Sequence, residues 1–167
     1  RTALSMCKKS SKAYEKAVKE HKSALKNAKS LQNVKSDQVS DAKTLTTLQS
    51  AVKDAQNLTA VGECSVDLSN AELRQRSKAM NELLPTLQSQ SKNLNDSATA
   101  VTNSQKAKEK QDNADALKKL ETAINNAQSL LDNSLYQVAD DSTRVTLQSA
   151  IDHALELFNG NSTDTNA

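Results

Sequence analysis

Apolar residues recur at helical spacing along most of the chain. In the N-terminal segment, Cys7, Tyr14, His21 and Ala28 lie seven residues apart, and further apolar residues stand between them. A stripe with this period runs along one side of an α-helix and packs along its length. The pattern therefore predicts a long helix over residues 3–32.

The same period and local capping signals predict five further helices. Ser69 and Glu72 have the spacing of a capping box in front of an apolar run, so a helix should begin near Asn70. Pro85 lacks a backbone N–H and disfavours a helical conformation at the residue before it. It should therefore end this helix, start the next one or kink a continuous helix. The five helices are expected over residues 37–58, 70–84, 86–110, 114–131 and 141–158.

An internal repeat sets the expected domain organisation. Residues 48–58 match residues 120–130 at an offset of 72, and residues 79–87 match residues 150–158 at an offset of 71. The identical positions of the first match are Leu48, Ala51, Ala55, Gln56 and Leu58, which recur as Leu120, Ala123, Ala127, Gln128 and Leu130.

Such self-similarity indicates a tandem duplication. We predict an all-α fold of two three-helix bundles, over residues 1–85 and 86–158, that form an elongated rod with a continuous or Pro85-kinked linking helix. The polar tail of residues 159–167 is predicted to be a disordered linker.

The amino-acid composition disfavours several classes of fold. Among 167 residues there are two glycines and only 2% aromatic residues, too few for a phosphate-binding loop, an aromatic groove or many tight hairpins. Nucleotide-binding α/β folds and β-sandwiches are therefore disfavoured. No segment approaches the ~20 apolar residues of a membrane span. We expect no membrane insertion, and a monomeric fragment of a larger protein.

The second repeat resembles a known bacterial module. Its helix Leu120–Leu131, a loop with Ser134 and Tyr136, and a second helix around Leu147–Leu157 are similar to FIVAR-type helical repeats of Gram-positive surface proteins. The first repeat matches less closely, because Cys64 appears where the loop tyrosine is missing. The resemblance implies an extracellular, cell-wall or secreted protein without catalytic residues, in which such modules form stalks or accompany adhesive parts.

Cys7 and Cys64 are the only cysteines. In an up-down-up bundle, the loop before the third helix returns to the starting end of the first helix, beside Cys7. The topology therefore favours a disulfide, which would indicate an oxidising compartment; the alternative is two free thiols. Two cysteines and two distant histidines, His21 and His153, lack the spacing of a metal site. Both histidines are expected at the boundary of the core.

Charge is concentrated in the first helix. Residues 1–35 hold ten basic and two acidic residues, a net charge of +8, so the remainder carries −6. The lysines with spacings typical of one helical face are Lys8, Lys12, Lys19, Lys22, Lys26 and Lys29.

This basic face has two interpretations. It could contact a polyanion such as a teichoic acid or a glycosaminoglycan. Alternatively, it is a solvated face that Asp37, Asp41 and Asp54 balance. A single arginine and a single tyrosine in this stretch argue against nucleic acid as the partner.

No spacing in the chain suggests a nucleophile with its base, and Asp140 and Asp141 are explained by capping of the helix that follows. We expect no enzymatic activity, catalytic residue, cofactor or metal. Two functions remain: a stalk or spacer of a bacterial surface protein, or an adhesive module that recognises a host protein or anionic glycan. Three sequons, at Asn57, Asn95 and Asn161, matter only in a eukaryotic secretory pathway.

Overall fold

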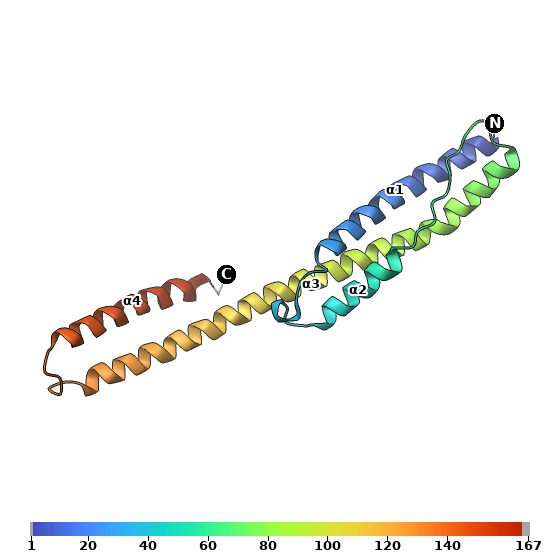
Figure 1. Ribbon diagram of the computed structural model, residues 1–167. Helices are drawn as coiled ribbons and strands as arrows, with labels where there is room; N and C mark the ends of the chain where they lie inside the picture. The colour runs from blue at the N-terminus through green and yellow to red at the C-terminus, as the bar shows by residue number, and fades with distance from the viewer. Residues whose placement is uncertain (1, 165–167) are drawn as a thin grey trace. The chain divides into compact units, whose positions relative to one another are not determined.

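The computed structural model describes residues 2–164 and confirms the all-α prediction (Figure 1). Its elements are α1 (Thr2–Ser30), the short 3-10 helix η1 (Ser36–Gln38), α2 (Lys43–Ala55), α3 (Asn70–Asn133) and α4 (Ser142–Asp164); the described range holds no β-strand. The chain divides into two compact units, residues 1–106 and residues 107–167.

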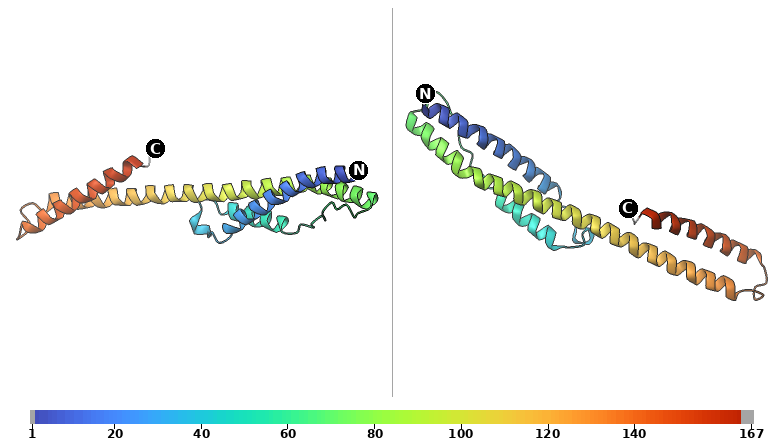
Figure 2. Two further views of the ribbon diagram at one scale, coloured as in Figure 1. Left: turned by 90° about the horizontal axis from the view of Figure 1, so that it is seen from above. Right: turned by 180° about the vertical axis from the view of Figure 1, so that it is seen from behind.

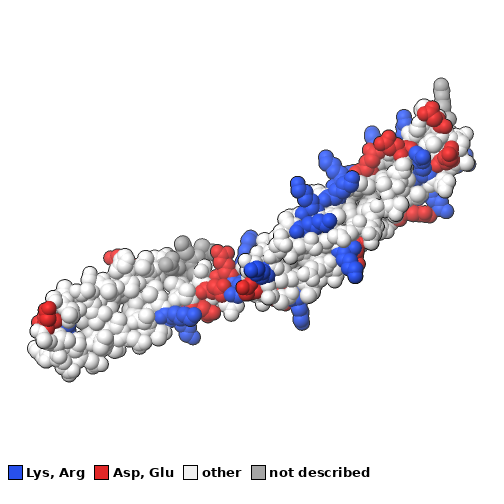
Figure 3. Space-filling view, in the orientation of Figure 1, with Lys and Arg blue, Asp and Glu red and all other residues white. Residues whose placement is uncertain are grey.

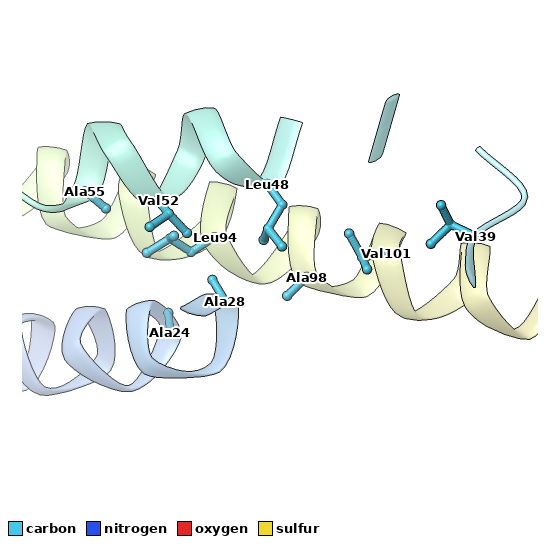
Figure 4. Packing of buried hydrophobic residues seen from close by; sticks show 9 residues of the cluster. All are labelled: Ala24, Ala28, Val39, Leu48, Val52, Ala55, Leu94, Ala98 and Val101. Carbon is cyan, nitrogen blue, oxygen red and sulfur yellow. The ribbon is translucent and has the colours of Figure 1, made fainter. Parts of the chain in front are cut away.

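In the first unit, α1 and the beginning of α3 run side by side in the same direction, and α2 runs against them (Figures 1 and 2). Near the start of both long helices, Cys7 packs with Leu73. Farther along, Ala28 of α1 shares a cluster with Val52 of α2 and Leu94 of α3. Figure 4 shows this last cluster, to which all three helices contribute.

The buried face of α1 is the predicted stripe and consists mainly of small side chains. Because alanine, serine and cysteine protrude little, α1 can approach its neighbours closely, and Tyr14 supplies the one large ring. The buried residues of α1 are Ala3, Cys7, Ser11, Tyr14, Ala17, His21, Ala24 and Ala28.

α3 is one continuous helix where the sequence predicted three. It begins at the expected capping box, where the hydroxyl of Ser69 accepts a hydrogen bond from the N–H of Glu72 (3.3 Å). Of the outcomes open at Pro85, the structure has the uninterrupted helix. Burial explains this, since Met80 and Leu87 on either side of Pro85 pack in one cluster with α1. Tertiary packing thus outweighs the hydrogen bond that proline cannot donate.

The break expected between residues 110 and 114 is also absent. This stretch is polar but contains neither glycine nor proline. An ion pair one helical turn apart, between Lys108 Nζ and Asp112 Oδ2 (2.6 Å), spans its beginning. The compact units divide at residue 106, whereas the sequence suggested residue 85, because α3 packs with α1 and α2 as far as Val101.

The second unit is an antiparallel pair of helices, the last part of α3 and α4 (Figures 1 and 2). Its core is small: Ile124, Leu131 and Ile151 are buried, with Leu120, Ala127, Leu147, Ala154 and Phe158 around them. The predicted three-helix form is wrong for this unit, because the segment 86–110 continues α3 instead of folding back. The tail is helical through Asp164 rather than disordered, and its prediction for residues 165–167 lies outside the described residues.

Candidate binding surface on the first helix

A disulfide fixes the N-terminal part of α1. Cys7 and Cys64 are bonded, with their Cα atoms 5.9 Å apart, and Cys7 is fully buried. The loop that follows α2 carries Cys64 back along the bundle to the beginning of α1 (Figure 1). The predicted pairing is therefore present, and the alternative of two free thiols is not.

Polar contacts hold the same loop along its length. The hydroxyl of Tyr14 accepts a hydrogen bond from the backbone N–H of Val61 (3.2 Å). Farther along, the guanidinium of Arg76 donates to the carbonyl oxygen of Glu63. Within the loop, the backbone forms a turn bond from the Leu68 N–H to the Ser65 carbonyl (3.4 Å). The course of the loop over α1 and α3 therefore depends on these polar contacts, on the disulfide and on the packing of Leu58 and Val61.

The opposite side of α1 presents lysines to solvent. At 100° per residue, the six predicted lysines fall within an arc of about 100° that extends over roughly 32 Å of helix. All six are exposed; they are Lys8, Lys12, Lys19, Lys22, Lys26 and Lys29, and we call this surface the lysine face. Figure 3 shows basic side chains gathered over α1.

The lysine face keeps most of its positive charge. One carboxylate, that of Glu15, lies within its arc and accepts a hydrogen bond from the hydroxyl of Ser11. None of the six lysines forms an ion pair with any residue in the described part of the chain; the pair of α1, Lys16 with Glu20 (3.8 Å), lies beside the face. A surface with net positive charge is therefore available to an anion.

The expected acidic neighbours do not neutralise this surface. Asp41 instead accepts a hydrogen bond from the backbone N–H of Lys43 (2.9 Å), a local turn contact before α2. Asp37 and Asp54 are exposed and form no ion pair within the described residues. None of the three expected aspartates therefore forms an ion pair with the lysine face within the described residues.

The two histidines have different environments. His21 lies inside the core with 2% of its surface exposed, not at the boundary, and its Nε2 has no hydrogen-bond partner in the structure described. Burial lowers the pKa of His21, and the nearby Gln90 side chain offsets part of this effect. His153 is exposed, with Nδ1 3.9 Å from Glu156 Oε2. Residues 2–164 contain no cluster of ligands for a metal ion.

Asp140 has the local role expected at the start of α4. Its carboxylate accepts hydrogen bonds from the backbone N–H of Ser142 (2.8 Å) and from the Ser142 hydroxyl (2.7 Å). These bonds stabilise the charged form and lower the pKa of Asp140. Of the sequon asparagines, Asn57 and Asn95 are exposed, and the side chain of Asn161 lies outside the described residues.

Sequence reasoning missed a set of exposed apolar residues in the second unit. Leu130 and Leu157 are 62% and 51% exposed, and the Tyr136 side chain in the loop between α3 and α4 is 94% exposed. The signal that could have found the helical ones is a second seven-residue spacing, Ala116, Ala123 and Leu130, beside the main apolar stripe.

The chain was compared with known proteins, and neither a protein-family model, nor a curated protein, nor a solved structure matches it. The resemblance to FIVAR modules therefore rests on the sequence motif alone. In the described part of the chain, no helix combines the length and the apolar character that crossing a bilayer requires.

Proposed function

We propose that this chain is a non-catalytic helical module of an extracytoplasmic, bacterial cell-surface protein, and that its first unit contributes to adhesion by binding an anionic polymer. The observation that carries the proposal is the lysine face, six exposed lysines on one side of α1 without ion-pair partners in the described structure. The partner would be an anionic glycan or a wall polymer with closely spaced sulfates, carboxylates or phosphates.

The disulfide supports the extracytoplasmic location. Disulfides persist in oxidising compartments and are rare in the reducing cytosol. The Cys7–Cys64 bond also holds α1 in place, so the lysines would be presented on a rigid helix. A rigid array loses less conformational entropy when it binds a repeating polymer.

Lysine rather than arginine defines the expected mode of binding. Ammonium groups act as point charges and do not make the planar, bidentate contacts of a guanidinium. Binding should therefore depend on charge density more than on polymer sequence, and it should weaken steeply as salt increases.

A binding assay with heparin and with lipoteichoic acid tests this function. Replacement of Lys12, Lys19 and Lys26 by glutamine should weaken binding about ten-fold or more at low salt and flatten its salt dependence. The matched control replaces Lys43, Lys53 and Lys106, which are exposed away from the face, and should bind nearly as well as the unaltered chain. Equal losses in both variants would contradict a specific role for α1.

A second function, that of a stalk or spacer, is favoured by the continuity of α3 through both compact units. A spacer would act through packing alone and would retain no ligand. Failure of the oxidised, folded chain to bind heparin, lipoteichoic acid or host matrix proteins would favour this second function.

A further inference from the structure

The two helices of the second unit carry an apolar stripe beside their shared core. Ala116, Ala123 and Leu130 of α3 lie about 80° around the helix from the centre of the buried seam, and so do Ala150 and Leu157 of α4. All five are exposed. In both helices the offset has the same rotational sense. Because the helices are antiparallel, the two stripes fall on the same side of the pair, and we call this side the open face.

The opposite side of the pair is different. At the corresponding offset it carries Glu121 and Asp132 on α3, and Gln148 and the 38% exposed Leu155 on α4. By contrast, no carboxylate lies on the open face between Ala116 and Leu130 or along the facing stretch of α4 that ends at Leu157. On α3 this is the asymmetry of a helix that packs against another helix on one side and faces water on the other.

The internal repeat shows what covers this stripe in the first unit. Ala123 and Leu130 correspond to Ala51 and Leu58 at the offset of 72. Ala51 packs partly buried against the cluster that contains Ala24 and Ala28 of α1. Leu58 packs against the cluster that contains Tyr14 and Ala17 of α1. The same residue types are therefore covered with the help of α1 in one unit and are exposed in the other.

The net charge of the second unit favours a basic helix similar to α1 as the partner on the open face. Residues 107–167 contain five basic and ten acidic residues, a net charge of −5, whereas α1 has eight lysines and two glutamates, a net charge of +6. A second copy of the acidic unit on the open face would bring like charges together. A basic helix with a seam of small residues would bring opposite charges together.

We infer that the open face binds an amphipathic partner helix with alanine-sized side chains on its apolar side and lysines on its outer side. The seam would dock between Leu130 and Leu157, as such helices do in apolar grooves. Burial of the two leucines would supply much of the affinity, and the charge difference would speed association.

A synthetic peptide with the sequence of Thr2–Ser30 and Cys7 replaced by serine is the probe, added to the complete oxidised chain. Fluorescence anisotropy should show saturable binding, and methyl resonances of Leu130 and Leu157 should shift. The double substitution Leu130→Gln with Leu157→Gln should weaken binding about ten-fold or more. The control pair, Val145→Gln with Leu155→Gln, alters exposed apolar residues away from the open face and should leave binding intact.

A second peptide separates packing from charge. It keeps every lysine but carries Ala17→Gln, Ala24→Gln and Ala28→Gln, and it should bind at least about ten-fold more weakly if the seam docks as inferred. Equal binding of both peptides, or leucine resonances that do not move, would overturn the inference. So would sedimentation showing that the unaltered chain dimerises through Leu130 and Leu157, since a second copy would then occupy the face.

Discussion

The phenolic oxygen of Tyr14 lies 3.2 Å from the backbone nitrogen of Val61 and accepts its hydrogen bond. Tyr14 is buried in α1, and Val61 belongs to the loop that leads from α2 to α3. The loop's own backbone offers this N–H no helical partner. The Tyr14 side chain therefore packs in the core and also holds the loop in place through a hydrogen bond.

Substitution of Tyr14 by phenylalanine should lower the free energy of unfolding by about 1 kcal/mol. The ring still fills its site, but the N–H of Val61 loses its acceptor. Urea denaturation gives the free energy, and hydrogen exchange at the Val61 amide should become faster. Tyr136→Phe is the matched control, since Tyr136 is 94% exposed and its change should have no measurable effect.

Removal of the disulfide should destabilise the first unit much more. In the chain-entropy model, a bond between residues 57 apart contributes roughly 4 kcal/mol through its effect on the unfolded chain. The double substitution Cys7→Ser with Cys64→Ser should therefore move the urea midpoint of this unit strongly downward. A reducing agent should do the same to the unaltered chain and nothing further to the variant. A loss below about 1 kcal/mol would contradict this expectation.

Stability should fall as the solution becomes acidic, because of His21. Burial lowers the pKa of His21 in the folded state below its ordinary value of 6.5, which applies in the unfolded chain. Between these two values the unfolded state binds more protons. The contribution of neutral His21 is therefore complete above pH 6.5 and is lost as the pH falls toward the lower, folded pKa.

Thermal denaturation at pH 7.5 and pH 5 tests this pH dependence. His21→Gln should reduce the difference in melting temperature between pH 7.5 and pH 5. His153→Gln should leave that difference unchanged, because His153 is exposed. An identical pH profile for the His21 variant and the unaltered chain would show that the acid sensitivity arises elsewhere.

Pro85 lies inside α3, where it cannot donate a backbone hydrogen bond. Pro85→Ala should therefore raise the stability of the first unit by roughly 1–3 kcal/mol, because the donor is restored and the ring no longer crowds the preceding turn. Gln88→Ala, at an exposed position on the same helix, should change stability by less than about 0.5 kcal/mol. A destabilised Pro85 variant would mean that the ring makes packing contacts of its own.

The sequence predicts those parts of the fold that depend on periodicity and topology. The seven-residue spacing from Cys7 to Ala28 identifies the buried side of α1, and the chain reversal at α2 brings Cys64 to Cys7. Interruptions are harder to predict. A proline or a polar stretch gives only a local tendency to interrupt a helix. At Pro85, the packing of Met80 and Leu87 with α1 outweighs that tendency.

The candidate surfaces show the same division. Lysines spaced along one helical face could be recognised directly in the sequence. Their freedom from Asp37, Asp41 and Asp54 could not, because ion pairing depends on how helices align along one another. The seven-residue spacing that ends at Leu130 indicates a second apolar stripe but not its exposure, since the corresponding Leu58 packs against a core cluster in the first unit.

The bond between Cys7 and Cys64 also affects how the chain would respond to a protease. Helical backbone resists cleavage, so the loop of residues 56–69 is a natural point of attack in the first unit. A cut on the amino side of Cys64 leaves Cys7 in one fragment and Cys64 in the other, and the fragments stay covalently joined. A cut beyond Cys64 leaves both cysteines in the same fragment. A single nick before Cys64 would therefore leave α1 attached to α3 until the disulfide is reduced.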